Sequence, residues 1–149
     1  REIKRIKARV EGERLPQGAD PRRHLKLGPG TLSDVEWMVQ LLQLRDGHRV
    51  PGLRTTSTLK ALDAAVEADL LPKGGGEQLR QAWLLSSRLR SAMTLLTGQT
   101  KDVLPLDVRE LDGVGRLLGY PDRSAFALEE DYMRVTRRAR RVFETQFYG

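Results

Sequence analysis

The sequence predicts an all-α protein: a bundle of five or six helices in a single domain over residues 1–149, with a long Gly/Pro-containing loop before the second helix. Apolar residues recur at helical spacing in several segments, and no segment shows more than a few residues of the alternation typical of a strand. Clusters of Gly and Pro separate the helical segments. With 149 residues, 39% of them hydrophobic, the chain is long enough to bury a core.

Composition narrows the class of protein further. No apolar run approaches the roughly 18 residues of a membrane span, so no membrane partner is expected. The absence of Cys excludes disulfides and Cys-based metal sites and agrees with a reducing compartment. Because the chain begins at Arg1 without an initiator Met or a signal-type segment, we expect a piece of a longer cytoplasmic protein. The net charge of +6 raises nucleic acid as a possible partner.

The first helix is expected over residues 1–11, where apolar residues at helical spacing alternate with Lys and Arg. Residues 15–30 contain repeated Pro and Gly, which predicts a long loop. Ser33 and Glu36 match a capping box at the start of the second helix. The flanking positions of a hydrophobic staple are taken by Leu32 and Trp37.

A third helix is expected after Thr58, with Leu59, Leu62, Val66 and Leu70 on its inward face. A Pro- and Gly-containing turn ends this helix, and the longest apolar stripe of the chain follows the turn. The sequence therefore predicts a long fourth helix after the turn.

The fourth helix carries its stripe from Leu79 to Leu96 and is expected to end at Gly98. Asp107 and Glu110 match another capping box, which predicts a short fifth helix. A final helix is expected over about residues 124–147. Its predicted inward residues are Leu128, Tyr132, Val135, Ala139, Val142 and Phe143.

The loop before the second helix is the first candidate site. Lys26 supplies a positive charge, Gly28 and Gly30 let backbone N–H groups approach a ligand, and the helix start adds its dipole. The pattern is not a Walker A motif, in which the Lys follows the glycines. An ordinary glycine-containing loop before a capped helix explains the same spacing.

Two carboxylates, Asp34 and Glu36, follow this loop. Residues two apart lie about 200° apart around a helix, so one Mg²⁺ cannot easily bind both. Glu36 is expected in the capping box, which leaves Asp34 as the better candidate for an outward role. Asp is also common in the first turn of a helix, so a structural role stays open. His24 and His48 are isolated in the sequence, and no metal site is expected.

Basic residues form the second candidate surface. Arg134, Arg137, Arg138 and Arg141 share one face of the final helix, opposite its apolar stripe. A polyanion could dock on this face. The solvated outer face of a bundle helix has the same appearance, and Glu130 lies one turn before Arg134 in the favourable orientation for an ion pair.

The stretch from Lys26 to Gln40 resembles the KxGxGGxxD(I/V)E(F/W)xxQ signature of the bacterial glutamine synthetase adenylyltransferase/deadenylylase family. The signature belongs to the helical domain that follows each nucleotidyltransferase domain. Thr31 stands where the family has the second of two adjacent glycines. The matching residues are Lys26, Gly28, Gly30, Asp34, Val35, Glu36, Trp37 and Gln40. The resemblance continues through residues 13–16, 53–56, 58, 61–62, 83–90, 104–105 and 117–120, and the C-terminal Phe-Tyr-Gly is similar to actinobacterial members.

The resemblance implies an enzyme that transfers AMP from ATP to a tyrosine of glutamine synthetase, and removes it in a separate half, under control of PII and glutamine. In this family, Asp residues of a GSxxDxD-type motif bind Mg²⁺ and ATP, and this sequence lacks that motif. We therefore expect the C-terminal helical domain of the adenylylating half, inactive alone and binding no cofactor by itself.

The resemblance also implies a place for the candidate residues. The domain would form one wall of the active-site cleft, with Lys26, Gly28, Gly30, Asp34 and Glu36 facing the nucleotide or the catalytic domain. Expected partners are the enzyme's own nucleotidyltransferase domain, glutamine synthetase and PII. A helical nucleic-acid-binding module that uses the Arg134–Arg141 face is the alternative, and the resemblance favours the enzyme over it.

Overall fold

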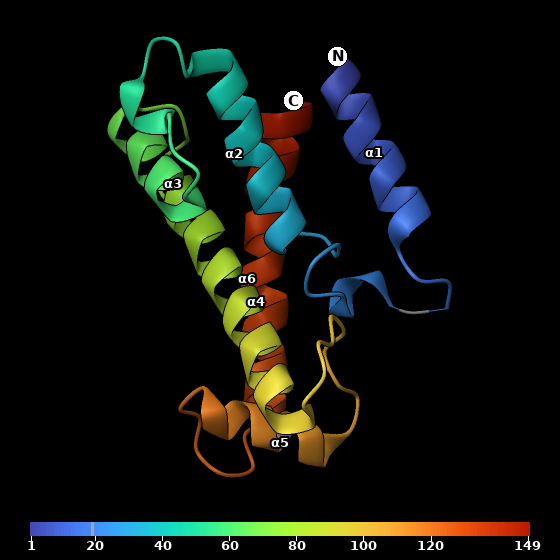
Figure 1. The fold of residues 1–149 in the computed structure, drawn as a ribbon. Helices are drawn as coiled ribbons and strands as arrows, with labels where there is room; N and C mark the ends of the chain where they lie inside the picture. The colour runs from blue at the N-terminus through green and yellow to red at the C-terminus, as the bar shows by residue number, and fades with distance from the viewer. Residues whose placement is uncertain (19) are drawn as a thin grey trace.

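The computed structural model describes residues 1–18 and 20–149, and these residues form six α-helices and no β-strand (Figure 1). The predicted all-α bundle of five or six helices is confirmed. The helices are α1 (Glu2–Arg14), α2 (Leu32–Asp46), α3 (Thr58–Glu67), α4 (Gly75–Thr97), α5 (Val108–Leu117) and α6 (Ala125–Phe143). Two 3-10 turns, η1 (Pro21–Arg23) and η2 (Pro51–Leu53), and a terminal π turn, η3 (Glu144–Tyr148), complete the fold.

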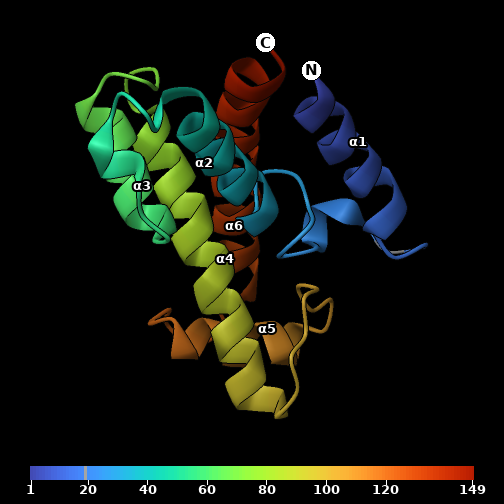
Figure 2. The same cartoon turned by 45° about the horizontal axis from the view of Figure 1, so that its top comes forward.

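The long helices α4 and α6 form the central pair of the bundle and have the most extensive helix–helix contact (Figure 1). With 23 residues, α4 spans roughly 35 Å. Helices α2 and α3 pack on one end of this pair, and α5 crosses the other end (Figure 2). Both chain termini lie at the α2 end, and α1 stands to one side of the bundle (Figures 1 and 2).

The core consists of two apolar clusters that follow this division. The larger cluster lies between α2, α3, α4 and α6 and includes Val35, Leu42, Leu62, Leu79 and Phe143. The second cluster lies where α5 crosses the central pair. Its buried residues include Leu25, Leu89, Met93, Leu104, Leu111, Leu128 and Tyr132. Because α4 and α6 contribute to both clusters, each end of the bundle is tied to the same two helices.

Several predicted helix ends are confirmed. The Asp107 carboxylate accepts hydrogen bonds from the N–H groups of Arg109 and Glu110, which makes it the N-cap of α5. Gly98 ends α4 in the left-handed conformation, and its N–H donates to the Thr94 carbonyl. The cap of α3 is shifted by one residue, because Ser57 and not Thr58 accepts the first-turn N–H.

The capping box predicted for α2 is wrong. The helix begins at Leu32, its N-cap is Thr31, and no side chain caps it. Ser33 is already buried inside the first turn, so it cannot pair with Glu36 as predicted. Backbone carbonyls of the preceding loop take over this role: the Ser33 N–H donates to the Lys26 carbonyl at 2.8 Å.

Some predicted inward positions are also corrected. Val66 is 50% exposed because α3 packs through Ala61, Leu62 and Ala65. The final helix ends at Phe143, after which the π turn places Phe147 in the core beside Trp37. Stacking of Phe147 on Phe143, with ring centroids 4.7 Å apart, closes the α2 end of the bundle.

The loop before α2 packs its backbone directly on α6 at Gly30. A Cβ atom built there would lie 1.9 Å from the Thr136 carbonyl oxygen, and Gly30 has a φ of +72°. Only glycine fits both the contact and the backbone conformation. Gly28 is also enclosed, because its Cβ would lie 2.4 Å from the carbonyl oxygens of Pro21 and His24.

We predict that Gly30→Ala lowers the free energy of unfolding by at least about 3 kcal/mol, because the new methyl group forces the loop away from α6. Gly98→Ala is the matched control, since Gly98 has a similar φ of +69° and open space around it. That variant should lose only about 1 kcal/mol. Denaturant unfolding measures both values, and equal losses would contradict a steric role for the Gly30 contact.

Candidate functional site

Asp34 lies at the start of α2, fully buried, and faces two cations. Its Oδ1 is 2.8 Å from the Lys7 ammonium, and its Oδ2 is 3.0 Å from the Arg140 guanidinium. The Gly30 N–H also donates to Oδ2, at 2.6 Å. Oδ1 accepts no well-directed hydrogen bond, so the Lys7 charge alone compensates it. The prediction that Asp34 has an outward role is therefore wrong.

Glu11 completes a cluster of four charges that joins α1, α2 and α6. Its carboxylate lies 2.7 Å from the Arg140 guanidinium and 3.1 Å from the Lys7 ammonium. Lys7 is 1% exposed, and both cations lie within 5.5 Å of the Phe143 ring centroid. We call Lys7, Glu11, Asp34 and Arg140 the ion cluster.

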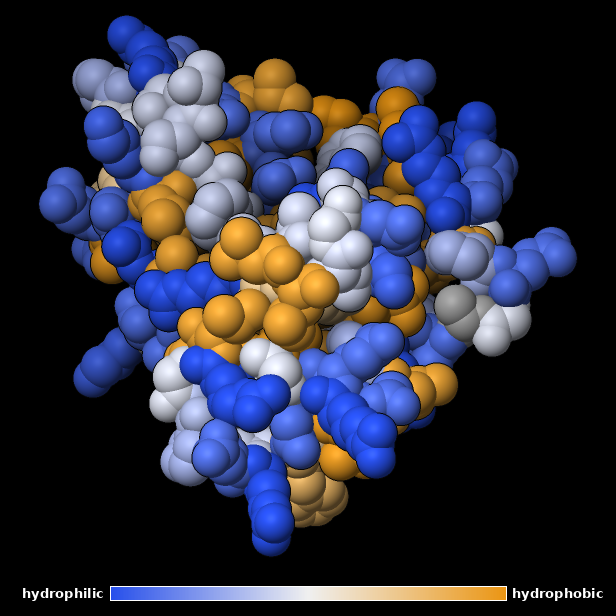
Figure 3. All heavy atoms as spheres, turned by 60° about the horizontal axis from the view of Figure 1, so that its bottom comes forward, coloured by the Kyte–Doolittle hydropathy of each residue, from blue (hydrophilic) through white to orange (hydrophobic). Residues whose placement is uncertain are grey.

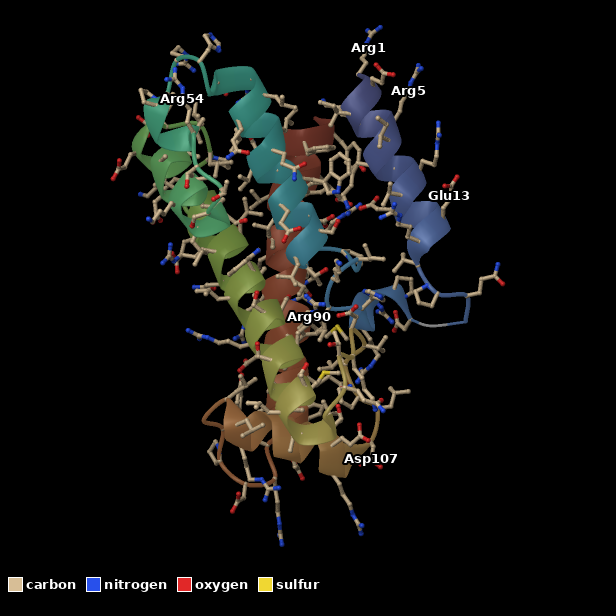
Figure 4. All side chains as sticks on the ribbon, viewed as in Figure 1. Arg1, Arg5, Glu13, Arg54, Arg90 and Asp107 are labelled. Atoms are coloured by element: carbon tan, nitrogen blue, oxygen red, sulfur yellow. The ribbon has the colours of Figure 1, made fainter. Side chains whose placement is uncertain are left out.

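The ion cluster attaches α1 to the bundle, together with Ile3, which packs against the larger core cluster. Among the described residues, α1 packs closely along no other helix, and Lys7 is its only buried residue. Its outer face is charged, and Arg1, Arg5 and Glu13 point away from the bundle (Figure 4). A signal for the inward position of Lys7 is present in the sequence, because Lys7 shares a helical stripe with Ile3 and Val10.

Glu11 carries a shifted pKa. Burial acts to raise it, but the hydrogen bond from Arg140 and the charge and hydrogen bond of Lys7 outweigh burial, so the pKa of Glu11 lies below its ordinary value of 4.5. Burial acts to lower the pKa of Arg140, but its hydrogen bonds to Glu11, Glu144 and Asp34 and the charge of Asp34 outweigh burial and raise that pKa. The pair is therefore charged at neutral pH.

The glycine loop does not offer free N–H groups to an anion. The Gly28 N–H donates to the His24 carbonyl at 2.9 Å, the Gly30 N–H to Asp34, and the Thr31 N–H to the Gly28 carbonyl at 3.2 Å. These groups are used within the protein, so the loop does not fit a backbone phosphate cradle. Both glycines allow the loop to pack closely. An ordinary glycine-containing loop, the alternative stated from the sequence, therefore describes this backbone better than a ligand-binding loop does.

The loop is fixed at its other end by Arg23 and His24. The buried Arg23 guanidinium donates to the Leu104 carbonyl and lies 3.3 Å from the Glu129 carboxylate. His24 forms an isolated antiparallel bridge with Val103. Its Nδ1 accepts the Leu27 N–H at 2.9 Å, and burial lowers the pKa of His24, so the neutral ring is favoured.

Lys26 and Glu36 differ from Asp34 in accessibility. The side chain of Lys26 is exposed on the loop, and Glu36 is half-buried on α2. Of the stretch singled out in the sequence, Lys26 is therefore the charged group most open to a ligand. Asp34 and the two glycines lie beneath it as support.

A groove lined by arginines lies between this loop and α6, with a volume of about 400 Å³. Arg22 from η1 and Arg137, Arg140 and Arg141 from α6 converge on it. Its other lining residues are Pro29, Met133, Thr136 and Glu144. We call this cavity the arginine groove. The contributions of Arg22 and Arg140 were not predicted from the sequence, because they depend on how the loop packs against α6.

The charges in the arginine groove are unevenly neutralised. Arg22 pairs with Asp20, and Arg140 belongs to the ion cluster. Arg137 and Arg141 are exposed one turn apart, and neither forms an ion pair with any residue that the structure describes. Two uncompensated guanidinium groups at this spacing suit a phosphate or carboxylate ligand.

The other two predicted basic residues lie outside the arginine groove. Arg138 is exposed on α6, as expected for the predicted face. Arg134 pairs with Asp131 at 2.8 Å, not with Glu130, and lines a smaller cavity that also contains Glu129.

Within residues 1–18 and 20–149, no three His, Cys, Asp or Glu side chains gather as they would around a metal ion. No helix in the described part of the chain is long and apolar enough to cross a membrane.

We predict that Asp34→Asn lowers the free energy of unfolding by about 3–5 kcal/mol, because it keeps the acceptor for Gly30 but removes the fully buried one of the two carboxylates that Lys7 and Arg140 share. Glu36→Gln is the matched control two residues away and should change stability by no more than about 0.5 kcal/mol. Urea unfolding of both variants measures the difference. Similar losses in the two variants would show that the cluster is not the main electrostatic support of α1.

The pH dependence of stability should carry the contribution of Glu11. Because its folded pKa is lowered, this contribution is present above the ordinary pKa of 4.5 and is lost as the pH falls through the lowered value. The stability difference between the natural chain and Glu11→Gln should therefore be larger at pH 7 than at about pH 3. Unfolding midpoints across this range test the sign, and a difference that grows on acidification would contradict it.

Comparison with known proteins places these features in a family. A family-wide sequence model described as GlnD PII-uridylyltransferase matches residues 3–147. The bifunctional glutamine synthetase adenylyltransferase/adenylyl-removing enzyme of Leifsonia xyli subsp. xyli is 61% identical over all 149 residues. The proteins of that name from Streptomyces coelicolor and Mycobacterium leprae are 54% and 51% identical over the whole chain.

In each of these relatives, the matched segment is 15% of the protein's length. The resemblance found in the sequence is confirmed, including its similarity to actinobacterial proteins. Because the match covers nearly the whole chain, this protein belongs to the family described as GlnD PII-uridylyltransferase.

Proposed function

We propose that this chain is the helical domain of a glutamine synthetase adenylyltransferase, a cytoplasmic enzyme that transfers AMP from ATP to a tyrosine of glutamine synthetase. The observation that carries the proposal is the match of the entire chain to one segment of relatives named for this activity. The domain would be the C-terminal helical domain of the adenylylating half, next to the nucleotidyltransferase domain.

The Mg²⁺ and ATP sites are assigned to that catalytic domain. This sequence lacks the GSxxDxD-type motif of the resemblance. Asp34 does not fit a Mg²⁺ ligand either, because both its oxygens face cations of the protein itself. The residues of this domain would act by positioning and by charge.

The arginine groove is the part of the domain best suited to meet the nucleotide or the catalytic domain. Arg137 and Arg141 offer uncompensated donors to phosphate oxygens, and Arg guanidinium groups bind such oxygens in a bidentate manner. Lys26 is exposed on the loop whose Arg22 and Pro29 form one wall of the groove. ATP phosphates therefore fit these residues, whereas they do not fit the glycine backbone.

Partners follow from the same assignment. Glutamine synthetase would be the protein substrate, and PII the regulator. Nucleic acid is the weaker alternative, because Arg134 is paired with Asp131 and Glu129 and Glu130 lie beside Arg137 around the neighbouring cavity. Acidic groups interleaved with the arginines disfavour binding of the continuous phosphate backbone of a nucleic acid.

The first test compares two proteins for transfer of labelled AMP to glutamine synthetase. The longer enzyme that contains this segment should transfer AMP, and the 149-residue chain alone should not. Transfer by the chain alone would overturn the assignment of the chemistry to another domain.

We further predict that the double change Arg137→Ala and Arg141→Ala in the longer enzyme lowers kcat/KM for ATP by about 10- to 100-fold, because two charge-assisted contacts are lost. Arg88→Ala is the matched control, an exposed arginine on α4, and should stay within about twofold. A folded double variant with unchanged kcat/KM would remove the arginine groove from the reaction.

A further inference from the structure

A second cavity, of about 530 Å³, lies at the end of the bundle where α5 crosses the central pair. Its walls come from the last turns of α4, from the loop before α5, and from α5 itself. Leu96, Val103, Leu106 and Val114 give it an apolar lining, and Met93, Leu104 and Pro105 extend it. We call this cavity the α5 groove.

The groove opens into an exposed apolar surface. Leu106 is 80% exposed, Leu96 is 48% exposed and Val103 is 39% exposed. Val108 and Leu95 add to the apolar surface of the same end at 63% and 77% exposure. Figure 3 shows a connected apolar patch on this side of the molecule, flanked by hydrophilic side chains. Contiguous exposed apolar surface of this kind marks an interaction site.

The absence of a side chain at one position keeps the groove open. Gly113 lies on the α5 wall, and a Cβ atom there would approach the Leu96 side chain to 3.1 Å. A larger residue on α5 would fill the space between α5 and α4. The missing side chain at Gly113 therefore leaves space between α5 and Leu96 of α4.

The rim of the groove is mostly basic. Lys101, Arg109 and Arg116 line it, against a single acidic residue, Glu110. None of these three cations forms an ion pair with another residue that the structure describes. A partner that places apolar side chains in the groove and carboxylates at its edges would therefore satisfy both parts of the surface.

The groove lies far from both chain termini. Both chain termini lie at the opposite end of the bundle (Figures 1 and 2), and the helix α4 that separates the two ends is 23 residues long. Any chain that continues from either terminus attaches at that far end. Such a segment would have to extend along the length of α4 before it could enter the groove. Its lining residues are also distinct from those of the arginine groove.

We propose that the α5 groove docks an acidic amphipathic helix of a second protein. Apolar residues at positions i, i+3 or i+4, and i+7 of that helix would enter the groove between Leu96, Leu106 and Val114. Glu or Asp residues beside them would meet Lys101, Arg109 and Arg116. The basic rim sets the orientation and the preference for acidic segments, and apolar burial supplies most of the affinity.

The test uses the 149-residue chain and two synthetic helical peptides as probes, one with a Leu stripe and Glu elsewhere, the other with the same stripe and Lys in place of Glu. The acidic peptide should bind saturably in fluorescence anisotropy, and the basic peptide should bind at least about 10-fold more weakly. Amide NMR shifts of the α5 groove residues should move on binding, and those of α2 should not.

Leu106→Glu should weaken binding of the acidic peptide by at least about 10-fold, because it places a like charge in the apolar lining. Leu44→Glu is the matched control, since Leu44 is 69% exposed on α2 at the other end of the bundle, and it should stay within about twofold. Both sites are exposed, so the fold should tolerate either change.

Three outcomes would overturn the proposal: no saturable binding of the acidic peptide, equal binding of the basic peptide, or equal loss in the Leu106→Glu and Leu44→Glu variants. Once the peptide result is positive, titration with purified glutamine synthetase and with PII identifies which natural partner presents such a helix. The proposal does not depend on AMP transfer, so its failure would leave the proposed function intact.

Discussion

The rest of this structure depends on the ion pairs that the buried Asp34 carboxylate forms with Lys7 and Arg140. Moving charges from water into a protein interior is costly, and a buried ion pair often adds little net stability. Removal of one member of such a pair lowers stability strongly, because the remaining charges are then buried without compensation. Lys7 is in that position, since its ion pairs are with Asp34 and Glu11, whereas Arg140 also pairs with Glu144 at 2.9 Å. The ion cluster therefore acts mainly by allowing a single arrangement of α1, α2 and α6.

This arrangement in turn shapes the arginine groove. Asp34 accepts the Gly30 N–H, and the missing side chain of Gly30 lets the loop lie on the α6 backbone. The same loop carries Arg22 and Pro29, which form the wall opposite Arg137 and Arg141. Residues of the family signature thus contribute to the groove indirectly. They hold the loop against α6, and the charges exposed around it are available to a ligand.

The fold was largely predictable because helix ends obey local rules. Asp107 and Gly98 define their helix ends through contacts within a few residues, and both were correctly predicted. The candidate site was less predictable. Helical geometry correctly predicted that Asp34 and Glu36 lie on different faces of α2. Asp34 is buried because it pairs with Lys7 and Arg140, which are far away in the sequence. The prediction of the α2 cap failed for a similar reason. The loop folds back and supplies backbone carbonyls, and no short sequence motif indicates this arrangement.

Stability is distributed unevenly in this domain, and the distribution bears on how it can work. Helices α4 and α6 contribute to both core clusters, so the arginine groove on α6 and the α5 groove are held on one rigid pair. Their separation should stay fixed while either is occupied. Helix α1 has only one buried residue, a lysine, and contacts the bundle through the ion cluster and through Ile3, which packs against the larger core cluster. Elements with few apolar contacts open at the lowest free energy, so any rearrangement should begin at α1 and reach the arginine groove through Arg140. The α5 groove, which shares no lining residue with the ion cluster, would be unaffected by that movement.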